Sequence, residues 1–90
     1  MHQIKCCVTG KVQFVMFRDF VLRNARMLNL VGYVKNMKDG SVCIVAQGNK
    51  KQLTALTELL LQGPAFAKVQ NVTEEWCDPI ETFSDFHISY

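Results

Sequence analysis

An Asp-Gly pair near the middle of the chain limits the possible folds more than any other feature. Asp39 and Gly40 lie between two short runs of strand-forming residues, 33–36 and 41–46. Glycine accepts positive φ without strain, so Asp-Gly between extended segments is a strong local signal of a β-hairpin. The sequence therefore predicts two antiparallel strands joined by residues 37–40, and the other elements must be arranged around this hairpin.

A helical pattern lies on each side of the hairpin. The first helix is predicted over residues 18 to about 30, from apolar residues at helical spacing: Phe17, Phe20, Val21, Ala25 and Leu28. The second follows Asn49, which forms a capping box with Gln52 three residues later. It ends at the Gly63-Pro64 pair. Its leucines at helical spacing, interpreted as core packing, are Leu53, Leu56, Leu59 and Leu60.

Strand-like segments occupy both ends of the chain. Residues 3–9 are rich in Ile, Cys and Val, residues 68–76 have the looser pattern of an edge or bulged strand, and residues 83–90 form a short last strand. Trp76 and Tyr90 are interpreted as packing residues. The order β-α-β-β-α-β predicts an α+β, ferredoxin-like sandwich: one domain over residues 1–90, with an antiparallel sheet and two helices on one face.

Composition excludes several classes of function. With 10 Lys and Arg against 8 Asp and Glu, the net charge of +2 is too small for a general nucleic-acid-binding surface. The chain has no apolar run of the roughly 18 residues that span a membrane, and its first residues lack a signal-peptide pattern. These features predict a cytoplasmic protein.

Four cysteines, Cys6, Cys7, Cys43 and Cys77, raise the question of disulfides or metal ligation. Adjacent residues of a strand point to opposite faces, so Cys6 and Cys7 are not expected to bond to each other or to share a metal. The chain contains no Cys-x-x-Cys motif. We expect reduced cysteines that act as small hydrophobic residues. A bridge from Cys6 or Cys7 to Cys77 stays an alternative, and no metal site is predicted.

The segment over residues 10–18 ends a strand, crosses a short loop and opens a helix. Backbone N–H groups converge at such a junction, and the helix dipole adds positive potential that favours an anion. Arg18 presents a planar fork of donors that matches phosphate oxygens. A second polar segment, residues 32–42, contains Asn36. Lys11, Lys35 and Lys38 also fall in these two segments, which together predict a pocket for a small phosphate-like anion.

The two segments resemble the two signatures of the acylphosphatase family. The first signature reads roughly Gly-basic-Val-Gln-Gly-Val-x-Phe-Arg, and the matching residues are Gly10, Lys11, Val12, Gln13, Val15, Phe17 and Arg18. The second reads roughly Gly-aromatic-small-basic-Asn-x-x-x-Gly-x-Val, followed by a further Gly. Its matching residues are Gly32, Tyr33, Val34, Lys35, Asn36, Gly40, Val42 and Gly48. Chain length and element order also resemble a stand-alone acylphosphatase, so the resemblance covers essentially the whole chain.

The resemblance implies metal-independent hydrolysis of acyl phosphates to a carboxylate and inorganic phosphate, with no cofactor. Arg18 would bind the phosphoryl group and Asn36 would orient the attacking water. The substrate-binding loop would use backbone N–H groups of Gln13, Phe14, Val15, Met16 and Phe17 beside Arg18. The expected partner is a small acyl phosphate or inorganic phosphate, with no nucleic acid or membrane. The expected state is a monomer or small homo-oligomer.

Phe14 departs from the first signature, because the family has glycine at this position. A loop that needs positive φ here would be strained by about 1–2 kcal/mol with a side chain. The alternative is therefore a degenerate member that binds phosphate or another anion and turns over slowly or not at all. Residues 14–17 also resemble the end of the RNP1 motif of RNA-binding domains. That motif places its aromatics on a central strand, whereas these residues precede a helix.

Overall fold

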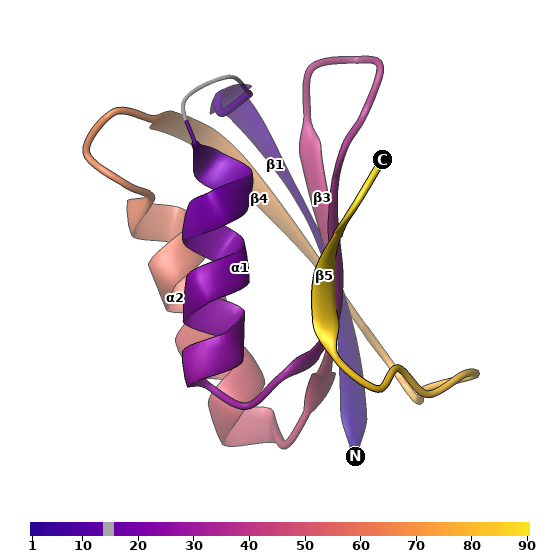
Figure 1. Cartoon of the computed structure of the whole chain (residues 1–90). Coiled ribbons are helices and arrows are strands. Elements are labelled where there is room, and N and C mark those ends of the chain that lie inside the picture. The colour runs from indigo at the N-terminus through magenta and orange to yellow at the C-terminus, as the bar shows by residue number, and fades with distance from the viewer. Residues whose placement is uncertain (14–15) are drawn as a thin grey trace.

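A five-stranded β-sheet carries both helices on one face and leaves most of its other face uncovered (Figure 1). The computed structural model describes residues 1–13 and 16–90. The strands are β1 His2–Lys11, β2 Val31–Asn36, β3 Val42–Gly48, β4 Lys68–Cys77 and β5 Phe86–Ser89. The helices are α1 Phe17–Met27 and α2 Lys50–Gln62. This arrangement confirms the predicted α+β sandwich.

The strand order across the sheet is β4-β1-β3-β2-β5. β1 pairs in antiparallel fashion with β3 and with β4, and β2 pairs so with β3. The last strand differs from the antiparallel expectation, since β5 runs parallel to β2. Parallel pairing needs a connection that crosses the sheet. Residues 78–85 supply it by leading the chain from the β4 edge to the β5 edge.

The predicted local signals form as expected. In the β2–β3 hairpin Gly40 has φ 94°, and the Met37 N–H donates to the Ser41 carbonyl at 2.8 Å. Asn49 and Gln52 make both hydrogen bonds of a capping box at the start of α2. Gly63 follows that helix with φ 65°. The local chemistry of turns and caps therefore determines where these elements begin and end.

Boundaries differ where the sequence pattern was ambiguous. The first strand runs two residues beyond the predicted end, and the first helix stops at Met27 because Asn29 adopts a left-handed conformation with φ 59°. The predicted edge or bulged strand is correct: β4 lies at the sheet edge. Its register with β1 shifts by one residue, since Thr9 pairs with Asn71 and Gly10 with Val69.

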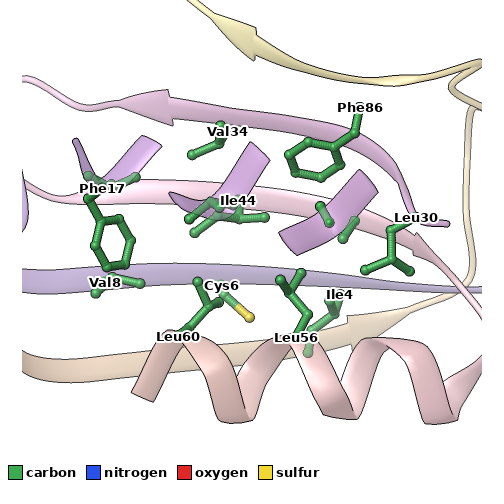
Figure 2. Close-up of a cluster of buried hydrophobic side chains, with 14 of the residues drawn as sticks. Ile4, Cys6, Val8, Phe17, Leu30, Val34, Ile44, Leu56, Leu60 and Phe86 are labelled. Atoms are coloured by element: carbon green, nitrogen blue, oxygen red, sulfur yellow. The ribbon is translucent and has the colours of Figure 1, made fainter. Parts of the chain in front are cut away.

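The core lies between the sheet and the two helices (Figure 2). Alternate residues of β1 point toward the helices, and the leucine stripe of α2 packs against them, as the sequence predicted. Burying one such side chain stabilises the fold by about 1.5–3 kcal/mol. The fully buried apolar residues include Ile4, Cys6, Val8, Val21, Val34, Ile44, Leu53, Leu56 and Leu60.

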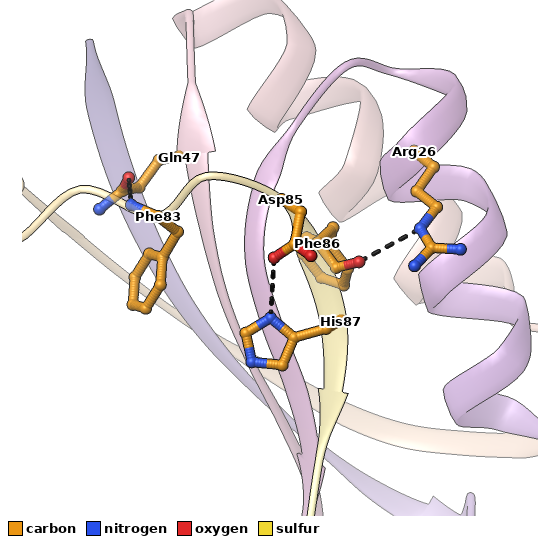
Figure 3. Close-up of polar contacts among 6 residues, drawn as sticks. All are labelled: Arg26, Gln47, Phe83, Asp85, Phe86 and His87. Carbon is orange, nitrogen blue, oxygen red and sulfur yellow. Dashed lines mark hydrogen bonds and ion pairs between the residues drawn. The ribbon is translucent and has the colours of Figure 1, made fainter.

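Gln47 fastens the connection between β4 and β5 to the sheet. Its Oε1 accepts a hydrogen bond from the Phe83 N–H at 3.2 Å (Figure 3), and its Nε2 donates to the Glu81 carbonyl. The Phe83 ring meets the Tyr33 ring edge-on, with centroids 5.6 Å apart. These contacts cover one end of the helix-free face. Among the described residues, neither helix is long and apolar enough to cross a membrane.

Candidate active site

A pocket of about 270 Å³ opens where α1 begins, beside the end of β2. It brings together Arg18 and Asn36, which lie in different sequence motifs. The remaining lining residues are Val12, Met16, Phe17, Asp19 and Ile88. The structure thus places the predicted arginine and asparagine in one small cavity at a helix N-terminus.

The backbone at this helix start has an unusual conformation. Met16, the residue before α1, has φ 61°, in the left-handed region that residues other than Gly, Asn and Asp seldom adopt. No described side chain caps the helix. The N–H groups of the first turn have no acceptor within their own helix. They therefore suit an anion in the pocket, which the helix dipole would also attract.

Arg18 is half-buried, and the Tyr90 ring lies over its guanidinium. The Cζ of Arg18 is 5.2 Å from the ring centroid of Tyr90, within the range of a cation–π contact. Tyr90 follows β5, which Arg26 ties to α1 by donating from Nε to the Phe86 carbonyl at 3.2 Å (Figure 3). The interpretation of Tyr90 as a packing residue is wrong, because it is 89% exposed. Its contact with Arg18 places it beside the pocket instead.

Asn36 ends β2 with its amide oxygen buried. The Oδ1 atom has no hydrogen-bond partner among the described residues. A buried polar atom without a partner costs about 1–3 kcal/mol. Since Asn36 also lines the pocket, this oxygen is available to accept a hydrogen bond from a ligand or from water.

The other residues of the predicted phosphate loop divide between two roles. Gln13 donates from Nε2 to the carbonyls of Met37 at 2.8 Å and Ser41 at 2.9 Å, so its side chain ties the loop to the β2–β3 hairpin. The Phe17 side chain is only 1% exposed and belongs to the core, which leaves its backbone N–H for the pocket. The predictions for Phe14 and Val15, including the strain at Phe14, fall on residues 14–15, outside the described residues.

The hairpin that receives Gln13 is itself internally braced. Ser41 donates from its backbone N–H and from Oγ to the Asp39 Oδ1, at 2.9 and 2.6 Å. Both hydrogen bonds lower the pKa of the Asp39 carboxyl, and the one from the Ser41 side chain has the larger effect. The turn is therefore held in one shape by a charge-assisted contact at neutral pH.

Comparison with known proteins agrees with this geometry. The acylphosphatase family model matches residues 4–88. An acylphosphatase of Dehalococcoides mccartyi is 43% identical over 91 residues, with both chains covered completely. One of Actinobacillus succinogenes is 46% identical over 88 residues, covering 98% of each chain. The chain belongs to the acylphosphatase family. The crystal structure of the Bacillus subtilis acylphosphatase superimposes with a TM-score of 0.97, at 37% identity, over the whole of both chains.

The first glycine of each acylphosphatase signature is required by close backbone approach. A Cβ at Gly10 would lie 2.1 Å from the Lys68 carbonyl oxygen, and one at Gly32 would lie 1.9 Å from that of Val45. Both glycines also have positive φ, 124° and 139°. Each begins the segment that carries a site residue, so these glycines let the strands approach closely enough to define the pocket.

The prediction of reduced cysteines is wrong for two of the four. Cys7 and Cys43 form a disulfide between the directly paired positions of β1 and β3, with Cα atoms 4.1 Å apart. Cys6 and Cys77 are free, so the alternative bridge to Cys77 does not form. The reason is the sheet register, which sequence spacing does not reveal. No cluster of three or more His, Cys, Asp or Glu suited to a metal ion occurs within residues 1–13 and 16–90.

Proposed function

We propose that this acylphosphatase hydrolyses its substrate in the pocket at the start of α1, with Arg18 and Asn36 in the two central roles. Family membership and the full-length relatives identify the chain as an acylphosphatase, and the family acts on small-molecule acyl phosphates. The observation that supports the residue roles is the shared pocket of Arg18 and Asn36, in which the Asn36 oxygen is buried without a described partner.

Arg18 binds the phosphoryl group in this proposal. Its guanidinium donates two parallel hydrogen bonds to phosphoryl oxygens, and such charge-assisted pairs are about twice as strong as neutral ones. The first-turn N–H groups of α1 add donors for a further oxygen. Phosphoryl transfer depends mainly on positioning and on stabilising charge over the equatorial oxygens. The guanidinium and the N–H groups supply that positive charge without a metal ion.

Asn36 orients the attacking water. Its Oδ1 accepts a hydrogen bond from the water and so turns a lone pair of the water oxygen toward phosphorus. The water oxygen bonds to phosphorus while the bond from phosphorus to the acyl oxygen breaks, and the electron pair leaves with the carboxylate. Since a carboxylic acid has a pKa of about 4, this leaving group needs no general acid at neutral pH. The proton of the attacking water goes to a phosphoryl oxygen.

Benzoyl phosphate hydrolysis by single variants tests these roles. Arg18→Ala removes the phosphoryl clamp and is expected to lower kcat/KM by about 10³-fold, with inorganic phosphate inhibition lost as well. Asn36→Ala is expected to lower kcat by about 10²-fold, because the water loses its orientation, while phosphate inhibition stays within about threefold. The split between binding and turnover distinguishes the two residues.

Two matched variants control for surface effects. Arg23→Ala removes an arginine on the same helix whose partner is Asp19 at the surface, with the N–O distance 2.8 Å. Asn71→Ala removes an exposed asparagine of the edge strand. Both are expected to keep activity within about twofold, since exposed pairs contribute little. Activity losses in the controls equal to those in Arg18→Ala and Asn36→Ala would contradict the proposed site.

A slow, anion-binding member of the family is the alternative, and only Phe14 favours it. Wild-type hydrolysis at the uncatalysed rate, combined with measurable phosphate binding, would establish this alternative. Phe14→Gly then tests the cause: if the loop needs positive φ at this position, restoring glycine relieves about 1–2 kcal/mol and should raise the rate about 5- to 30-fold. A fast wild-type enzyme that gains less than twofold from this substitution would exclude it.

We further propose a cytoplasmic enzyme without nucleic-acid partners, active as a monomer or a small homo-oligomer. The small net charge of +2 supports the absence of a nucleic-acid partner. Light scattering of the purified chain measures its assembly state. Salt-sensitive binding of single-stranded RNA would contradict this part of the proposal.

A further inference from the structure

We propose that Cys7 and Cys43 form a thiol–disulfide exchange site for a low-molecular-weight thiol, with Cys7 as the sulfur that the incoming thiolate attacks. The pair lies on the face of the sheet that carries no helix. It lies in a groove of about 420 Å³, large enough for a ligand of a few residues. The proposal does not depend on the roles of Arg18 and Asn36.

The sheet holds the two sulfurs together whether or not they are bonded. Cys7 and Cys43 are directly paired, and the β1–β3 ladder continues on both sides, from His2 with Gly48 to Val8 with Val42. The core on the opposite face does not involve this pair. Breaking the bond therefore leaves two thiols facing each other in a folded sheet, and no rearrangement is needed to form it again. Such preorganisation gives intramolecular reactions a high effective concentration.

Access distinguishes the two sulfurs. A thiolate attacks a disulfide sulfur from the side away from the departing one. For Cys7 that side is occupied by Thr73, a small residue directly paired with it on the edge strand β4. For Cys43 it is occupied by the longer Lys35, its partner on β2. Cys7 is also more exposed, whereas Cys43 is 9% exposed. The open approach therefore leads over Thr73 to Cys7.

The surroundings of Cys43 suit its role as the departing sulfur. Lys35 is the residue paired with Cys43 on β2, and a lysine ammonium beside a cysteine favours the thiolate form. In the disulfide form the Cys43 sulfur lies 3.9 Å from the Ser41 Oγ. Because Ser41 already donates to Asp39, this oxygen can accept a hydrogen bond from the Cys43 thiol once the disulfide is reduced. Asp39 lines the same groove, and Glu75 pairs with Lys5 across β1 and β4.

The exchange balances as two thiol steps. The thiolate of the small thiol bonds to the Cys7 sulfur, the Cys7–Cys43 bond breaks, and its electron pair leaves with Cys43, which then takes a proton. A second small thiol attacks its own counterpart in the mixed disulfide and releases Cys7 as a thiolate. In total two small thiols are oxidised to one disulfide, and the protein disulfide is reduced to two thiols. The reverse sequence uses the small disulfide as oxidant.

Glutathione is a suitable probe, used with the full chain carrying Cys77→Ser to remove the exposed free thiol. The folded protein is equilibrated with mixtures of reduced and oxidised glutathione, alkylated, and analysed by mass spectrometry. We expect a transition between disulfide and dithiol forms with an unchanged circular dichroism spectrum. A bond that never forms under excess oxidised glutathione, or that is reduced only on unfolding, would overturn the proposal.

Variants that keep one cysteine of the pair, in the same background, test which sulfur reacts, and both keep the buried Cys6. Oxidised glutathione should modify Cys7 in Cys43→Ser at least about tenfold faster than Cys43 in Cys7→Ser, in line with exposure. Equal rates would overturn the assignment to Cys7.

A steric variant tests the approach path in a chain that keeps both cysteines. Thr73→Phe should slow reduction of the disulfide at least about fivefold by obstructing the approach. Thr54→Phe, an exposed position on α2, serves as its control and should not change the rate. An equal rate in both variants would overturn the path over Thr73.

Discussion

The two faces of the sheet give neighbouring cysteines opposite properties. Cys6 is fully buried beneath the helices, and burial, with a smaller contribution from Glu74, raises the pKa of its thiol to about 12. Cys7, one residue later, lies on the helix-free face and is bonded to Cys43. Side chains alternate between the two faces along a strand, so the buried, inert thiol of Cys6 and the accessible sulfur of Cys7 belong to adjacent residues.

This difference separates the residues that stabilise the fold from the residues that carry reactive groups. The helix-covered face is apolar along its length and becomes polar only at its end, where α1 begins and Arg18 meets Asn36. The helix-free face carries a groove lined by lysines, threonines and the cysteine pair beside apolar side chains such as Tyr33 and Val45. We therefore expect substitutions on the covered face to change stability and substitutions elsewhere to change reactivity.

The largest expected contrast lies between Ile4 and Lys5 on β1. Ile4 is fully buried under the helices, whereas Lys5 is exposed on the other face. Ile4→Ala should lower the free energy of unfolding by about 2–5 kcal/mol, through lost burial and the cavity left behind. Lys5→Ala should change it by less than about 0.5 kcal/mol. Urea denaturation measures both, and similar losses would show that the faces do not differ in this way.

Sequence alone predicts the covered face well, because its signals are local. The leucine stripe of α2, the Asn49 capping box and the hairpin at Gly40 each depend on residues a few positions apart. The two signatures also bring Arg18 and Asn36 into one site prediction. Local patterns suffice here because one helical or strand period specifies which side is buried.

The features that sequence analysis missed all depend on contacts between distant segments. The bond between Cys7 and Cys43 depends on the register between β1 and β3, which brings together two cysteines 36 residues apart in sequence. The placement of Tyr90 over Arg18 needs the parallel pairing of β5 with β2. A one-residue slip in either pairing would reverse the side chains, and no local pattern specifies it. The amide side chain of Gln13 indicated that it could form hydrogen bonds, but the sequence did not reveal that the acceptors are the Met37 and Ser41 carbonyls.

The buried Cys6 thiol also predicts a smaller effect, a dependence of the free energy of unfolding on pH. Burial raises the pKa of the Cys6 thiol from its ordinary 9.0 to about 12 in the folded protein. Between these values the unfolded chain loses a proton that the folded chain keeps, so stability falls as pH rises. The expected slope is about 1.4 kcal/mol per pH unit.

Cys6→Ala should remove this slope while leaving the rest of the alkaline profile unchanged. Urea midpoints of wild type and Cys6→Ala, compared from pH 8 to pH 11, isolate the contribution of this thiol. Parallel profiles would mean that the Cys6 pKa is the same in both states. Cys77→Ala is the matched control, because Cys77 is an exposed free thiol, and it should keep the wild-type slope.

The smallest expected effect concerns Tyr90, at the end of the covered face. Its ring lies over the Arg18 guanidinium, and an exposed cation–π contact contributes about 0.5–1 kcal/mol. Tyr90→Ala should therefore raise the KM for benzoyl phosphate about two- to fivefold, because the guanidinium loses its support, while kcat changes less.

Tyr90→Phe keeps the ring and should behave like wild type. If Tyr90→Phe instead matches Tyr90→Ala, the hydroxyl and not the ring acts on Arg18. Ile80 is 98% exposed and lies in the connection between β4 and β5, so Ile80→Ala controls for loss of an exposed apolar side chain.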